Sequence, residues 1–179
     1  MPFESVGLFN VLLAVLATAA AAWTDFRTGR IPNWLTFGAA AAGVALRVVQ
    51  SRPHAYGAAG ALAGMLVCAL VPVLIFRKDG MAGGDVKLFI ALGAILGAFH
   101  GIEAQFYAYV AGSLLSMARL AWHGRLLAVL VNAFFLALNP VMPRRWRREI
   151  RPEMLTRFRL GGSIFAGTCV SALSLYPVV

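Results

Sequence analysis

The stretch MAGGDVKL, residues 81–88, places Asp85 directly before the apolar run 88–99. A second aspartate, Asp25, directly follows the first apolar run of the chain, within the stretch WTDFRTGRIPN of residues 23–33. A carboxylate at the edge of a membrane segment is costly to desolvate, so such residues usually serve a function. Two carboxyl groups that share one proton can act as an acid and a base. The two stretches therefore predict an acid–base pair.

The composition indicates an integral membrane protein. Of its 179 residues, 60% are hydrophobic and only 13% are charged, whereas soluble domains carry about 25% charged residues. The mean hydropathy is +0.78. Abundant glycine and alanine suit close helix–helix approach inside lipid. We expect one membrane-embedded domain over residues 1–179.

The charge and the cysteines exclude two other classes of protein. The net charge is +9, but almost all the basic residues lie in short segments between apolar runs, where they set membrane topology rather than bind nucleic acid. Cys68 and Cys169 both lie inside apolar runs without a CxxC partner, which argues against a structural zinc site.

Seven apolar segments are candidates for helices that cross the membrane. No Lys or Arg precedes the first, so it predicts a retained helix rather than a signal peptide. Two are doubtful, because one is short and another contains Asn132, Asn139 and Pro140. The segments are 6–24, 33–50, 57–76, 88–100, 102–121, 126–142 and 160–177.

The basic residues predict the topology, since they favour the cytoplasmic side. With the N-terminus outside, the arginine-rich segment 143–159 stays inside only if 126–142 lies in the interface instead of crossing. The prediction is an all-α polytopic protein with six transmembrane helices, an additional interfacial cytoplasmic helix, a basic cytoplasmic loop 122–159 and a last helix 160–177. Asp25 and Asp85 then meet just inside the cytoplasmic surface.

Local features around the aspartates favour a built site, although each has a simpler interpretation. Gly29 permits a tight turn, and Pro32 suits the first turn of the next helix. Asp25 could instead be a solvated loop charge that pairs with nearby arginines. Asp85 could simply cap its helix, and Lys87 could reach lipid headgroups.

The two stretches together resemble the type IV prepilin peptidase family of GxGD membrane aspartyl proteases, over residues of about 15–121. The first motif is matched by Asp25, Arg27, Gly29, Ile31, Pro32 and Asn33, and the second by Gly83, Gly84, Asp85, Val86, Lys87 and Leu88. The resemblance implies an aspartic-type endopeptidase that cleaves prepilin leader peptides at the cytoplasmic face of the bacterial inner membrane.

The resemblance also implies roles for residues and partners. Asp25 and Asp85 would be the catalytic pair, and the supporting or substrate-binding residues would be Gly83, Gly84, Lys87, Ile31, Pro32 and Asn33. No metal or cofactor is implied. The partners would be a prepilin and a bilayer with anionic headgroups, with the pilus assembly machinery as a further candidate.

Three departures from the family pattern refine this expectation. Ala82 replaces the first glycine of the GxGD signature, and the stretch 158–163 before the last helix lacks the family's prolines. The larger, bifunctional members of the family carry a cytoplasmic insertion with paired CxxC motifs, which this sequence lacks. In this respect the sequence resembles the short, peptidase-only type that serves tight-adherence (Flp) pili.

Two alternative functions are compatible with the same pair of aspartates. A transporter or proton-conducting protein would relay protons through them, but a transporter would more often show an internal repeat and acids at the bilayer midplane. A scaffold subunit would keep the fold without activity. Presenilin-like proteases share the Gly-Asp signature but pair it with a different first motif.

Overall fold

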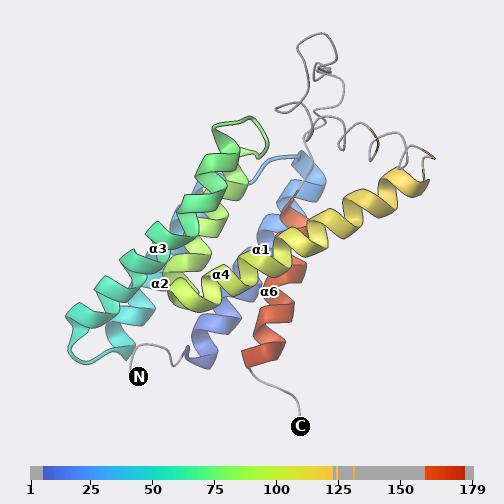
Figure 1. Cartoon of the computed structure of the whole chain (residues 1–179). Helices are drawn as coiled ribbons and strands as arrows, with labels where there is room; N and C mark the ends of the chain where they lie inside the picture. The colour runs from blue at the N-terminus through green and yellow to red at the C-terminus, as the bar shows by residue number, and fades with distance from the viewer. Residues whose placement is uncertain (1–5, 123, 125–130, 132–159, 176–179) are drawn as a thin grey trace. The chain divides into compact units, whose positions relative to one another are not determined.

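The computed structural model describes residues 6–122, 124, 131 and 160–175, and every regular element in these residues is an α-helix. The all-α prediction is therefore confirmed for this part of the chain. The expected interfacial helix 126–142 and most of the basic loop 122–159 lie outside the described residues. The helices are α1 (Leu8–Thr28), α2 (Asn33–Gln50), α3 (His54–Phe76), α4 (Gly83–Trp122) and α6 (Gly161–Leu175) (Figure 1).

The chain divides into two compact units. One comprises Met1–Gly112 and Arg159–Val179, and the other comprises Ser113–Phe158. The second unit contains the C-terminal end of α4, and all the packing described below lies within the first. The expectation of a single domain stays a prediction.

The helix boundaries follow the apolar segments closely, with one informative difference. Helix α2 begins at Asn33 and ends at Gln50, as the sequence predicts. Helix α1, however, continues past residue 24 to Thr28, so Asp25 lies in its last turn. The helix ends at Gly29, which has a left-handed φ of 67° and donates its N–H to the backbone oxygen of Asp25 at 2.8 Å. The tight turn predicted at Gly29 is thus confirmed.

Helix α4 folds back on itself at Gly97. Its φ of 84° and ψ of −176° are accessible mainly to glycine, and they divide the helix into two limbs that run in opposite directions (Figure 1). The limbs are close, since a Cβ on Gly101 would lie 3.2 Å from the Cα of Gly93. The sequence predicts two separate helices here, 88–100 and 102–121; the turn between them comes at Gly97, four residues earlier than expected.

Polar side chains of two other helices meet this turn. A break in a helix leaves backbone carbonyls that need other donors. The amide nitrogen of Asn10, on α1, donates to the backbone oxygen of Ile95 at 2.9 Å. The guanidinium of Arg47, on α2, lies against Gly97, at the negative end of the first limb's dipole. The turn is therefore tied to α1 and α2.

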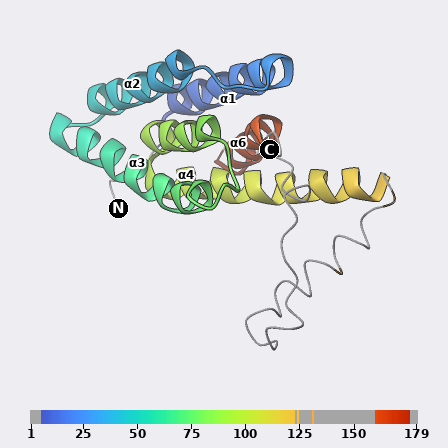
Figure 2. The ribbon, with the colours of Figure 1, turned by 90° about the horizontal axis from the view of Figure 1, so that it is seen from above.

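The first limb of α4 is the core of the bundle. Its large side chains Leu88, Phe89, Leu92 and Ile95 are almost completely buried. Glycines bring the neighbouring backbones close: Gly64 of α3 lies against Gly93, and Gly43 of α2 lies 2.9 Å, measured from a hypothetical Cβ, from the Cα of Ile95. Helices α1 and α2 lie side by side (Figure 2). Small residues at helix contacts are the usual packing device in lipid.

The outer surface is apolar, as a lipid-facing surface would be. Leu66, Leu70 and Leu74 of α3 are each more than half exposed. Within the described residues, α1, α3 and α4 are long and apolar enough to cross a membrane, and α6 is a shorter apolar helix. The number of spanning helices, six, stays a prediction.

Replacing Gly64 with alanine should destabilise the bundle. The added methyl group would collide with the backbone of Gly93, and overpacking of this kind costs about 1–3 kcal/mol. Gly60, on the same helix, is the matched control, because a Cβ there meets nothing within 4 Å. Thermal unfolding of the detergent-solubilised protein should show a lower Tm for Gly64→Ala and not for Gly60→Ala. Equal Tm values would contradict the close α3–α4 contact.

Candidate active site

Asp25 is a buried residue of α1 whose side chain contacts the start of α6. Its side chain is 7% exposed, so it is not a solvated loop charge, and that simpler interpretation is wrong. The backbone N–H of Gly161, the first residue of α6, donates to its Oδ2 at 3.3 Å. The positive end of the α6 dipole favours a carboxylate at this place. The fold therefore offsets part of the cost of burying the charge.

Asp85 is buried in the first turn of α4. The helix begins at Gly83, two residues earlier, so Asp85 lies in its first turn and not at the N-cap position itself. Its carboxyl interacts with the backbone N–H of Ala82, so it does help to satisfy the start of the helix. Its side chain is 3% exposed. A helix N-terminus again lies next to a buried carboxyl group, this time the group's own helix. Each aspartate thus lies next to a helix N-terminus, that of α6 for Asp25 and that of α4 for Asp85.

The two carboxyl groups belong to one site. The C-terminal end of α1 and the N-terminal ends of α4 and α6 lie at the same end of the bundle (Figure 1). Asp25 is near enough to Asp85 for the two carboxylates to repel each other. Carboxylates in this relation favour a state in which one is protonated and the other charged. This arrangement can supply both a general acid and a general base.

The turn that follows Asp25 packs against the start of α4. A Cβ on Gly84 would lie only 3.1 Å from the Cβ of Ile31, so glycine allows this close approach without displacing Ile31. Lys87 donates from Nζ to the Oδ1 of Asn33 at 2.8 Å. This contact gives Lys87 a protein partner where the sequence suggests lipid headgroups. The two motifs, far apart in sequence, therefore contact each other at two places.

The remaining predicted residues have simpler positions. Pro32 directly precedes α2, one position before the first turn in which it was expected, and its oxygen accepts from the backbone of Leu35 at 3.2 Å. Gly83 is the first residue of α4, and a Cβ there would make only an ordinary contact, 3.5 Å from the ring of Phe76. Packing therefore explains glycine at 84 but not at 83.

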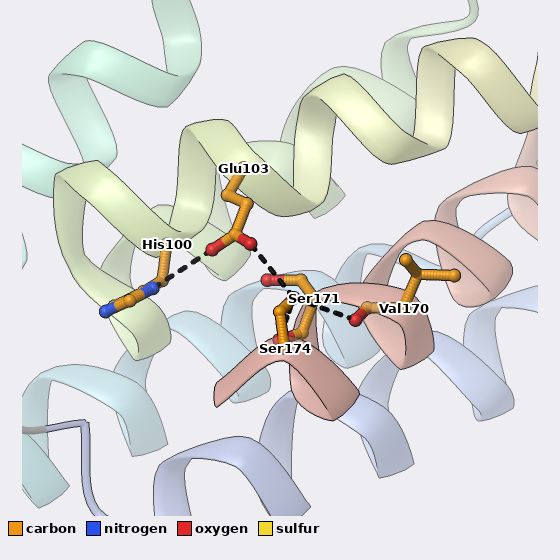
Figure 3. Close-up of polar contacts among 5 residues, drawn as sticks. All are labelled: His100, Glu103, Val170, Ser171 and Ser174. Carbon is orange, nitrogen blue, oxygen red and sulfur yellow. Dashed lines mark hydrogen bonds and ion pairs between the residues drawn. The ribbon is translucent and has the colours of Figure 1, made fainter. Parts of the chain in front are cut away.

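Two further acidic residues in the described part of the chain, Asp79 and Glu103, have surroundings of their own. Asp79 is exposed in the turn before α4, with a positive φ of 56°. Glu103 joins a polar cluster after the Gly97 turn, where its carboxylate contacts His100 Nδ1 at 3.2 Å and accepts from Ser174 Oγ at 3.0 Å (Figure 3). This cluster contains a serine, a histidine and an acid, as a catalytic triad does. However, Glu103 lies between His100 and Ser174, so His100 is not placed to activate the serine.

Gly161 is a residue of the site that the sequence did not predict as functional. Its neighbour Asp25 is 136 residues away in the chain, and no local pattern connects the two. The glycine-bearing stretch before the last helix was the available signal. As for metals, no cluster of three or more His, Cys, Asp or Glu residues occurs in the part of the chain that the structure describes. The expectation that no metal is used stays a prediction.

An all-helical membrane fold with two buried aspartates at one end defines a polytopic membrane protein with a carboxyl-pair site. Residues 11–117, more than half of the chain, match the type IV leader peptidase family, and the protein belongs to that family. The matched range contains both aspartates and both motifs.

Two curated proteins illustrate the similarity. The prepilin peptidase EppA of Methanothermobacter thermautotrophicus is 33% identical over 96 residues, which cover 51% of this chain and 24% of that protein. The prepilin leader peptidase/N-methyltransferase of Bacillus subtilis is 32% identical over 120 residues, which cover 64% of this chain and 46% of that protein. The alignments thus span less than half the length of either relative. No solved structure matches the chain.

Replacing Gly161 with alanine should disturb Asp25 directly. The new Cβ would lie 2.8 Å from Asp25 Oδ2 and 2.9 Å from Asp25 Cβ, so the aspartate must move. The adjacent Gly162 is the control, because a Cβ there meets nothing within 4 Å. Overpacking of about 1–3 kcal/mol should lower the Tm of Gly161→Ala, whereas Gly162→Ala should melt like wild type. A Tm for Gly161→Ala equal to that of Gly162→Ala would contradict the contact between α6 and Asp25.

Proposed function

We propose that this protein is a membrane aspartyl endopeptidase that cleaves the leader peptide of type IV prepilins, of the Flp type, at the cytoplasmic face of the inner membrane. The observation that carries the proposal is the burial of Asp25 and Asp85 together at one end of the helical bundle. Membership of the type IV leader peptidase family supports it, as do the names of the two relatives.

The chemistry follows from a carboxyl pair in two protonation states. The charged aspartate takes a proton from water as the water oxygen attacks the carbonyl carbon of the scissile peptide. The protonated aspartate then gives its proton to the leaving nitrogen as the C–N bond breaks. Since the two roles need one proton between them, the repulsion between Asp25 and Asp85 helps to keep the pair singly protonated.

The Flp specificity rests on the sequence resemblance to the short, peptidase-only type. Cys68 and Cys169 are both free cysteines. Cys68 is buried in α3, and Cys169 is partly buried in α6. The partners proposed are the prepilin, anionic lipid around the basic segments and, in the cell, the pilus assembly machinery.

Asparagine at either catalytic position should abolish cleavage of a co-expressed Flp-type prepilin. Asp25→Asn and Asp85→Asn keep the side-chain size and remove the acid–base function, which contributes about 10²–10⁴-fold in rate. Asp79→Asn is the matched control, because Asp79 is exposed and asparagine tolerates its positive φ. It should cleave like wild type.

Other outcomes would change the proposal in defined ways. Cleavage by both Asn variants at the wild-type rate would overturn the aspartyl mechanism and favour a proton relay that uses the same carboxyl groups. Cleavage of another class of prepilin, but not of the Flp type, would overturn only the substrate specificity.

The orientation is tested by single cysteines at opposite ends of α2. Arg30 and His54 are exposed on either side of this helix, and Cys68 and Cys169 are first replaced by alanine. A membrane-impermeant thiol reagent should label His54→Cys in intact spheroplasts, but Arg30→Cys only after permeabilisation. Labelling of Arg30→Cys from outside would place the aspartates at the wrong face, and labelling of both from one side would mean that α2 does not cross the membrane.

A further inference from the structure

The fold-back of α4 brings Tyr109 to the level of Asp85. The limbs run in opposite directions from Gly97, and Gly101 lies against Gly93. Further from the turn, the ring of Tyr109 packs on that of Phe89, with centroids 5.5 Å apart and planes inclined by 50°. The register set by Gly93 and Gly101, carried about two helical turns toward the start of the first limb, pairs Asp85 with Tyr109. Tyr109 and Asp85 are accordingly near enough to interact electrostatically.

The hydroxyl of Tyr109 is held by a buried amide. Gln105, one turn earlier on the same limb, donates from Nε2 to the Tyr109 oxygen at 3.0 Å. The Gln105 side chain is only 4% exposed, and burying an amide is costly unless it is hydrogen-bonded. Because the phenol oxygen accepts this bond, its own O–H proton can be donated to another acceptor. Gln105 therefore orients the hydroxyl as a donor.

A half-buried donor near a carboxyl pair matches a need of peptide hydrolysis. When water adds to the scissile carbonyl, the π electrons move to the carbonyl oxygen, which becomes an oxyanion. Neither aspartate can stabilise it as a donor while both are engaged with the water and the leaving nitrogen. A fixed O–H group in a site shielded from water is a strong stabiliser of such charge.

We propose that Tyr109 is a third catalytic residue, whose hydroxyl donates a hydrogen bond to the carbonyl oxygen of the scissile peptide, and that Gln105 is its positioning residue. The inference rests on the proposed peptidase function and adds one group to it. The Tyr109 proton is shared with the oxyanion but not transferred, so it returns to its original state when the C–N bond breaks and the carbonyl re-forms.

Tyr107 provides a matched control for the same chemical change. It lies two positions away, on a different side of the limb, and its ring contacts that of Phe106 with centroids 5.8 Å apart. Replacing either tyrosine with phenylalanine removes one hydroxyl and keeps the ring. The Tyr109 ring contacts Phe89 of the first limb, whereas the Tyr107 ring contacts Phe106 of its own limb.

The test is steady-state cleavage of a purified prepilin by the full-length protein in lipid nanodiscs. Loss of one oxyanion donor costs about 10²–10³-fold in kcat, so Tyr109→Phe should lower kcat by this factor with KM unchanged. Tyr107→Phe should keep both constants. A wild-type kcat in Tyr109→Phe would overturn the inference, as would a loss seen equally in Tyr107→Phe.

A double-mutant cycle separates orientation from packing. Gln105→Met keeps the volume but removes the amide, and it should lower kcat less than Tyr109→Phe does. Because Gln105 acts through Tyr109, the double variant should be no slower than Tyr109→Phe alone. Additive losses, or a lower Tm in Tyr109→Phe that accounts for the loss of activity, would show a structural role and overturn the inference.

The proposed function fails by a different pattern. If Asp25→Asn and Asp85→Asn cleave like wild type, the carboxyl-pair mechanism is wrong and the role of Tyr109 falls with it. If both aspartate variants are inactive while Tyr109→Phe is fully active, the peptidase mechanism stands and only the role of Tyr109 is overturned.

Discussion

Burial of the large side chains on the first limb of α4 is the constraint on which the site depends. Inside lipid, helices gain little from the hydrophobic effect and must associate through close packing. The contact between Gly64 and Gly93 brings the backbone of α3 directly against the backbone of this limb. The turn at Gly97 lets the second limb cover the first from another side. The limb can then carry Asp85 into a position that water and lipid do not reach freely.

Burial creates an electrostatic cost that the helix ends reduce. Asp85 lies at the N-terminus of α4, and Asp25 receives an N–H group from the N-terminus of α6. These fields favour a carboxylate, while desolvation and the neighbouring carboxyl group oppose a second charge. A pair that holds one proton is the state that the proposed acid–base hydrolysis requires.

Features encoded locally could be predicted from the sequence, and features that depend on contacts between distant segments could not. The apolar run of α2 gave its bounds, and Gly29 gave the turn after α1. Topology from the basic residues placed both aspartates at one end. In contrast, the Gly161–Asp25 and Lys87–Asn33 contacts join residues 136 and 54 positions apart. Helices that are apolar on every side also lack the periodicity that shows which face is buried, so the partners of Tyr109 left no signal.

The central claim is that the two motifs form one site, and a designed disulfide tests it most directly. In a chain with Cys68 and Cys169 replaced by alanine, Ile31→Cys and Gly84→Cys would place two Cβ atoms 3.1 Å apart, and a small adjustment gives the 3.5–4.5 Å of a disulfide. Ile31→Cys with Gly38→Cys is the control, because a Cβ on Gly38 meets nothing within 4 Å. Rapid oxidation of the first pair in native membranes, and not of the control, is the result that we predict. Failure of the first pair to cross-link would contradict the account.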